Sequence, residues 1–432
     1  MGFLFQTLLG FFADIGGAFS LLGKVWYFVV PFFFPLVRFV WREYIKVEYR
    51  KKVKYVVLEF IPPKEIEQSP KPMELFFAAL SGTIKSFNAY ERYIEGRLPN
   101  FFSFELVSNG GEIHFYIWCE RKYQNMVQAN LYAQYPDIEV FEVPDYVWSV
   151  PSTVPNNEWD LWGVEYEATR PDLYPIRTYK FFEEDVTGKM VDPMGSMLEV
   201  MASLPPGQQI WFQLMSWVAV PSTYQKDFKD TIKEFLGEKK KKKGMFSSGV
   251  LGDVADVFSN VFRGMFGTPE FTNTNEKEEE DPRPVEFRLR PIEKEVLKSL
   301  ETNMGKMQFL VKPRLVHVGR RESFDKTFSN KAFSGALNDF ADQNMNGFKK
   351  GRRSETKADF FMVEERSRQR KRRIRMRYRD RDDDPDDTSV LMSAEEMATM
   401  FHPPDMSVVT PAVPRVPAKR AGAPANLPIM RE

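Results

Sequence analysis

Residues 101–120 read FFSFELVSNGGEIHFYIWCE, and the architecture of the chain can be worked out from this run. Two apolar segments flank Asn109-Gly110-Gly111, a short link that indicates a β-hairpin. Side chains alternate along a strand. One face of the second strand therefore carries Ile113, Phe115, Ile117 and Cys119, and the other carries His114, Tyr116, Trp118 and Glu120. We expect Cys119 to lie on the apolar face and to be inert.

The segments before and after the hairpin give a characteristic order of strands and helices. An apolar run, YVVLEF at residues 55–60, predicts a strand that ends before Pro62-Pro63, and Met73, Phe76 and Leu80 recur at helical spacing. After the hairpin come a predicted helix at 121–135 and a strand, IEVFEV, at 138–143. This order of strand, helix, two strands, helix and strand is typical of a ferredoxin-like domain, here expected over residues 51–150.

The same order recurs, with insertions, over residues 151–380. Strands are expected at 162–168, 209–220 and 307–318, and helices at 193–204, 227–236, 293–303 and 323–340. The run RRIRMRYR (372–379) alternates Ile374, Met376 and Tyr378 with arginines and predicts the last strand. The predicted fold class is therefore α+β, with an N-terminal membrane anchor followed by two ferredoxin-like (split βαβ) units.

Arginines on the predicted last strand form a candidate contact site. Ten of the sixteen residues 366–381 are lysine or arginine. A row of arginines on an exposed strand could bind phosphates or a partner, and its members are Arg372, Arg373, Arg375, Arg377 and Arg379. The alternative is a solvated edge strand whose charge DRDDDPDD (380–387) neutralises. Tyr378 alone offers a stacking surface, so any nucleic-acid contact should be independent of sequence.

Residues 1–50 are expected to form a hydrophobic membrane anchor. The segment 15–41 is strongly apolar, Pro31 and Pro35 would kink a helix there, and a cluster of lysines and arginines follows it. The positive-inside rule places the remainder on the cytoplasmic side of the inner membrane. A single kinked span, a re-entrant hairpin and a soluble pair of hydrophobic helices are the alternatives. The expected membrane contacts are Trp26, Phe33 and Trp41.

An insertion at residues 237–284 differs in composition from the segments around it. Five lysines (239–243) precede an apolar stripe that includes Phe258 and Phe262. Such a helix could lie on an anionic lipid surface, or it could pack on the protein itself or on a partner.

Composition and motifs argue against catalysis. The 432 residues carry no net charge and contain one cysteine and three histidines. The sequence contains no phosphate-binding P-loop and none of the H-E-x-x-H, G-x-S-x-G or C-x-x-C motifs. We therefore expect a non-enzyme without cofactor or metal.

Residues 381–432 are expected to be a proline-rich linker or docking tail. Ser393 and Glu396 form a capping-box pattern that opens a short helix. Seven prolines follow in 26 residues, which favours an extended chain that lies along a partner or is disordered.

Several runs spread over residues 20–430 include LEFIPPKEIEQSPKPMELFF, FSFELVSNGGEIHFYI, NMVQANLYAQYPDIEVFEVPDY, QQIWFQLM, LMSAEEMATMFHPP and VTPAVPRVPAKRAGAPANLPI. These runs resemble the membrane-anchored N-terminal region of bacterial type IV secretion and conjugation-type (HerA/VirB-type) ATPase proteins. The resemblance implies a membrane-anchored scaffold that positions a P-loop translocation ATPase, which is either a separate polypeptide or fused in a longer form. No catalytic residue of the motor has a counterpart here. The alternative is a membrane-tethered module that binds nucleic acid, and a homo-oligomer is possible in either case.

Overall fold

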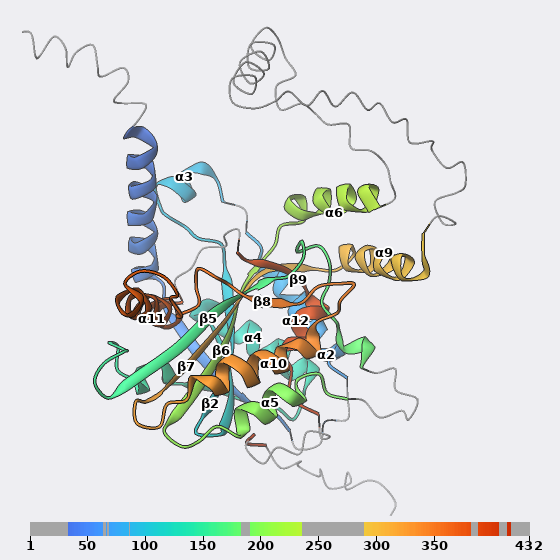
Figure 1. Ribbon diagram of the computed structural model, residues 1–432. Coiled ribbons are helices and arrows are strands. Elements are labelled where there is room, and N and C mark those ends of the chain that lie inside the picture. The colour runs from blue at the N-terminus through green and yellow to red at the C-terminus, as the bar shows by residue number, and fades with distance from the viewer. Residues whose placement is uncertain are drawn as a thin grey trace, which may run out of the picture.

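A computed structural model describes residues 33–63, 66, 69–85, 87–182, 191–235, 289–381, 388–405 and 413–415. Its centre is an antiparallel sheet in the order β4-β1-β3-β2-β6-β7-β5-β8, with β9 paired to β7 (Figure 1). The strands are β1 (Tyr55–Ile61), β2 (Phe101–Asn109), β3 (Glu112–Glu120), β4 (Glu139–Val143), β5 (Trp159–Ala168), β6 (Gln208–Val218), β7 (Gln308–Arg320), β8 (Phe348–Lys350) and β9 (Val390–Ser393).

Helices connect and cover the strands. Those that the structure describes are residues 33–52, α2 (Lys71–Ala79), α3 (Ala89–Tyr93), α4 (Gln124–Gln134), α5 (Gly195–Ala202), α6 (Pro221–Phe235), α9 (Pro291–Met304), η5 (Phe328–Phe333), α10 (Ser334–Ala336), α11 (Val363–Asp380) and α12 (Ala394–Met400). Short 3₁₀ turns, among them η3 (Tyr146–Ser149) and η4 (Tyr179–Phe181), lie between them.

The sheet has two halves that meet at β2 and β6. The order is β4-β1-β3-β2 in the first half and β8-β5-β7-β6 in the second, so each half contributes one terminal strand to the junction. These two strands pair over nine residues, from Phe101 opposite Trp217 to Asn109 opposite Gln209. Both are buried along nearly their whole length. An apolar strand left at a sheet edge would expose unpaired backbone groups, and pairing the two edges removes that cost.

The predicted fold class is therefore wrong in its arrangement. The chain is α+β, but its strands form one large antiparallel sheet rather than two separate units behind an anchor. Among the described residues, no helix is both long enough and apolar enough to cross a membrane. The sequence pattern identified individual strands but contained no signal for the pairing of β2 with β6.

Alternation along the strands creates two cores. Ile113, Phe115, Ile117 and Cys119 belong to a large cluster under α2, α4, α5, α10 and α12, which confirms the predicted apolar face of β3. Burial raises the pKa of the Cys119 thiol to about 12. The opposite face carries Tyr116, Trp118 and Trp211, which pack with Ile374 and Tyr378 of α11. In Figure 1, α11 lies on the other side of the sheet from α5 and α10.

The helix at residues 33–52 stands beside α3. Trp41 donates from its indole nitrogen to the Tyr93 carbonyl at 2.8 Å, and the Arg38 guanidinium lies 5.0 Å from the centre of the Tyr93 ring. Trp41 thus contacts α3, and both Trp41 and Phe33 remain exposed over nearly half of their surface. Trp26 and the insertion that contains Phe258 and Phe262 lie outside the described residues.

The predicted strand at residues 372–379 is also wrong, because these residues belong to the 18-residue helix α11. Ile374 and Tyr378 are buried one helical turn apart, while Met376 between them is 54% exposed. Strong helix formers (arginine, lysine, glutamate and glutamine) fill the run, and it contains neither glycine nor proline. Three alternating apolar residues were too few to separate a period of 2 from one of 3.6.

The tail prediction fails for residues 390–402. Ser393 and Glu396 do form the predicted capping box. However, β9 pairs with β7, every residue of α12 is buried, and Phe401 packs edge-on against Phe60. This part of the chain therefore belongs to the core and is not available as a docking tail.

Candidate functional site

Helix α11 is held on the sheet by groups that it buries. Arg375 donates from Nη2 to the carbonyls of Val147 (2.9 Å) and Val150 (3.2 Å), and its guanidinium lies 5.0 Å from the centre of the Trp211 ring. Burial, together with the nearby charge of Arg379, lowers the pKa of Arg375 to about 10. Tyr378 is fully buried, and its hydroxyl lies 2.7 Å from that of Tyr146.

A ladder of polar side chains crosses four strands beneath α11. Glu105, Gln213, Arg314 and Glu165 are opposite one another in the registers of β2, β6, β7 and β5. Gln213 donates to Glu105 Oε1 at 2.9 Å and accepts from Arg314 Nη1 at 3.0 Å. Arg314 also donates from Nη2 to Glu165 Oε1 at 2.8 Å. Each buried charge in this ladder therefore has a partner, as burial requires.

Residues at the end of α11 close the ladder. Arg381, at a φ of 46°, donates to both carboxylate oxygens of Glu105 (2.7 and 2.8 Å) and to Asp145 (2.6 Å). Burial alone would raise the pKa of Glu105. The charge of Arg381 and the hydrogen bonds that Glu105 accepts outweigh burial and hold this pKa below its ordinary value. The C-terminal end of α11 is thereby fixed to the centre of the sheet.

A groove of about 230 Å³ opens where α11 crosses β5. Its charged lining consists of Arg353, Arg370, Arg373 and Arg377 against the two carboxylates of Glu165 and Glu167. Glu165 is already engaged by Arg314 and, at 3.4 Å, by Arg377. Burial would raise the pKa of Glu165, but the charges of Arg314, Lys312 and Arg377 keep it lowered. The groove is therefore strongly cationic.

The arginines of α11 fall into two classes. Those with partners include Arg370, which donates to the carbonyls of Glu355 and Lys357, and Arg379, which pairs with Asp380. Within the described part of the chain, Arg372 and Arg373 make no hydrogen bond or ion pair, and the same is true of Arg353 across the groove. All three are exposed. We call Arg353, Arg372 and Arg373 the arginine face.

The five arginines predicted as one row are thus separated. Arg372 and Arg373 are exposed, Arg375 is buried in the core, and Arg377 and Arg379 are paired with acids. A helix turns successive residues by 100°, so these side chains cannot share one face. Arg353 and Arg370 were not among the residues predicted from the sequence. The basic run KKGRR (349–353) was a signal for the first of them.

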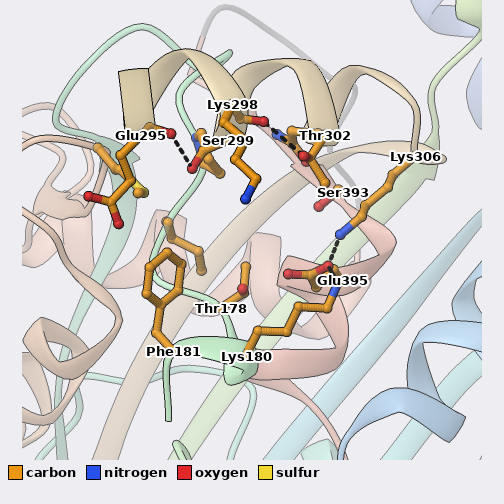
Figure 2. A pocket seen from close by; sticks show the side chains of 14 residues that line it. Thr178, Lys180, Phe181, Glu295, Lys298, Ser299, Thr302, Lys306, Ser393 and Glu395 are labelled. Atoms are coloured by element: carbon orange, nitrogen blue, oxygen red, sulfur yellow. Dashed lines mark hydrogen bonds and ion pairs between the residues drawn. The ribbon is translucent and has the colours of Figure 1, made fainter. Parts of the chain in front are cut away.

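A second cavity, of about 280 Å³, lies between α9, η4 and the start of α12. Lys180 and Lys306 both pair with Glu395, and Lys180 does so at 2.6 Å (Figure 2). Burial, with the charge of Lys180, lowers the pKa of Lys306 to about 8, although Glu74 opposes this shift. The amino group of Lys298 points into the cavity from α9 in Figure 2. The shared carboxylate fixes η4 to α12, so we assign this cluster a structural role.

Comparison with known proteins identifies a family without assigning an activity. No curated protein matches the sequence. One family model, described as a domain of unknown function (DUF8128), matches residues 96–415, which include every strand of the described sheet except β1, together with the groove and α12. The chain therefore belongs to the DUF8128 family.

Proposed function

We propose that this chain is a non-catalytic docking module that positions a P-loop translocation ATPase. The partner class comes from the resemblance of its sequence runs to the N-terminal regions of type IV secretion and conjugation-type ATPase proteins. The contact surface is the arginine face. The observation that carries this proposal is that Arg353, Arg372 and Arg373 make no hydrogen bond or ion pair with the residues that the structure describes, whereas the remaining arginines of α11 are all engaged.

Rigidity makes these arginines suitable for docking. Helix α11 is held by the buried groups Arg375 and Tyr378 and by Arg381 just after its end, so its outer face is fixed before a partner arrives. A preorganised surface loses less conformational entropy on binding. Arginine also pairs with carboxylates through two parallel hydrogen bonds, which gives direction as well as charge. The expected partner surface is acidic, and association should weaken as salt is added.

Biolayer interferometry with the purified ATPase tests the proposal. We expect Arg372→Glu with Arg373→Glu to weaken binding by at least about tenfold, because two attractive charges become repulsive. The matched control is Lys226→Glu with Lys229→Glu, which reverses two exposed charges on α6. Unchanged affinity in the arginine variant, or an equal loss in the control, would refute docking through this face.

Nucleic acid is the second candidate partner, and the three exposed guanidiniums of the arginine face favour it because they could hold phosphates. Five aspartates at residues 382–387 follow α11 directly in the sequence and would repel a phosphate backbone. Binding of double- or single-stranded DNA at physiological salt, lost in the Arg372→Glu, Arg373→Glu variant, would favour this candidate over the ATPase.

A further inference from the structure

The groove where α11 crosses β5 collects guanidiniums from two segments of the chain. Arg370, Arg373 and Arg377 are three and four residues apart, so one face of α11 presents all three to the groove. Arg353 lines the opposite side, in the turn that follows β8. Four guanidiniums therefore share a space of about 230 Å³.

The turn that carries Arg353 is fixed to β5. Gly351 donates to the Glu165 carbonyl at 2.9 Å, and the backbone nitrogen of Glu165 donates to Ser354 Oγ at 3.0 Å. A Cβ at Gly351 would lie 2.7 Å from Glu167 Oε1, so the close approach of this turn to the strand requires glycine. Since buried groups also hold α11 on the sheet, both walls of the groove are in place before a ligand arrives. A preorganised site loses less entropy when it binds.

The fold uses only some of the donors in the groove. Arg370 is held through Nη1, which donates to two backbone carbonyls, and Arg377 makes one contact of 3.4 Å, from Nη1 to Glu165. Arg353 and Arg373 make no hydrogen bond or ion pair with the residues that the structure describes. A guanidinium carries five N–H donors. All four side chains therefore have donors left for a ligand.

The charges of the lining favour a ligand with two negative charges. Four arginines against the carboxylates of Glu165 and Glu167 leave a net charge of +2. Groups just outside the lining do not reverse this balance, because buried Arg314 donates twice to Glu165, and Arg352 offsets Glu355 beside the turn. A carboxylate brings one charge and two oxygens. A phosphate ester brings about −1.5 to −2 at pH 7 and three strong acceptor oxygens, which matches the groove better.

Acidic residues after α11 favour a small ligand over a nucleic acid. Residues 382–387 contain five aspartates and precede Thr388, which lines the groove. Their charge weakens the binding of every anion. This repulsion adds up along a nucleic-acid backbone, whereas it acts only once on a single phosphate group.

We propose that this groove binds the dianionic phosphate group of a small molecule. Arg353 and the three arginines of α11 hold its oxygens through paired hydrogen bonds, the geometry in which arginine binds phosphate. Free phosphate ion and a small phosphate ester share this chemistry. The inference goes beyond the proposed docking function and does not rest on it. Because Arg353 and Arg373 also belong to the arginine face, bound phosphate should compete with an acidic partner for that surface.

Isothermal titration calorimetry with the full chain at physiological salt tests the proposal. Inorganic phosphate or glycerol 3-phosphate should bind with a Kd below about 1 mM, and acetate, with its single charge, at least about tenfold more weakly. Arg353→Ala with Arg373→Ala should weaken phosphate binding at least about tenfold, because two charge-assisted contacts are lost. The matched control is Arg352→Ala with Arg368→Ala, which removes two exposed arginines outside the groove. This control should change the Kd less than about twofold, because salt screens charges that do not touch the ligand.

The outcomes separate this proposal from the docking function. Tighter binding of glycerol 3-phosphate would identify an ester as the ligand, and tighter binding of inorganic phosphate would identify the free ion; both support the proposal. No heat from either compound at about 10 mM, ten times the expected limit of the Kd, would overturn it. Equal affinity for acetate and phosphate, or equal losses in the groove variant and its control, would also overturn it. A failure of the chain to bind the ATPase would refute docking alone, because no ATPase is present in this titration.

Discussion

Arg381 and Arg372 lie nine residues apart, yet the fold uses them in opposite ways. Arg381 is buried at the centre of the sheet, where Glu105 and Asp145 neutralise it, whereas Arg372 is exposed and makes no hydrogen bond or ion pair with any residue that the structure describes. The buried guanidinium fixes the end of α11 and contributes nothing that a partner could touch. Arg372 is not needed to hold the described part of the fold together. Mutations in α11 and just after its end should therefore separate effects on stability from effects on docking.

Breaking the buried pair should have the largest effect. Arg381→Met leaves the Glu105 carboxylate buried without its main partner, which typically costs about 3–5 kcal/mol in the free energy of unfolding. Urea denaturation measures this loss directly. Arg372→Met serves as the exposed control and should change stability by less than about 0.5 kcal/mol. Equal losses in the two variants would contradict the division between buried and exposed arginines.

The free energy of unfolding should fall at acidic pH because the fold buries a neutral histidine, His317. His317 accepts from Ser329 or donates to it at 2.9 Å, and its other ring nitrogen lies 2.8 Å from Gln208. Burial lowers the pKa of His317 from 6.5 to about 4. The unfolded chain therefore takes up a proton between pH 6.5 and 4 before the folded one does, and stability falls by about 3 kcal/mol across this range.

The control for this prediction is His317→Gln, which keeps an amide able to bond with the neighbours of the ring. Its stability should change less between pH 6.5 and 4 than that of the wild type. A parallel pH dependence in both proteins would show that other groups control acid stability.

Arg377 belongs to neither class and should show an intermediate effect. Its side chain is 38% exposed, and its guanidinium lies 3.4 Å from Glu165, which Arg314 holds independently. We expect Arg377→Ala to lower the free energy of unfolding by only about 1 kcal/mol, because the carboxylate keeps a partner. A loss as large as that of Arg381→Met in the same urea titration would mean that the groove and the buried ladder form one unit.

The smallest expected effect is a gain in stability. Met362→Gly replaces a side chain held at a φ of 49° by the residue that adopts this conformation most easily. Thermal denaturation should show a gain of about 0.5–1 kcal/mol. A clear loss would mean that the side chain of Met362 stabilises the fold despite its left-handed backbone.

Local patterns in the sequence predicted many of the strands and helices but few of the residues of the candidate site. The Asn109-Gly110-Gly111 turn and the alternation in β3 identified the hairpin and the apolar face with Cys119. The join between β2 and β6 escaped detection because pairing of distant strands leaves no local period. Which arginines are exposed depends on the helical period of α11. The predicted strand, with its period of 2, placed Arg375 on the same face as Arg373, although only Arg373 is exposed. The left-handed backbone at Phe361 and Met362 likewise had no signal in the sequence, because neither residue type favours that conformation.

Site-specific photo-crosslinking tests the central claim most directly. A benzophenone amino acid placed at position 372 in the full chain should form a crosslinked product with the P-loop ATPase, identified by mass spectrometry. The same probe at position 226 on α6 should not. A product at position 372 that contains only nucleic acid, or an ATPase product formed equally well from position 226, would contradict docking through the arginine face.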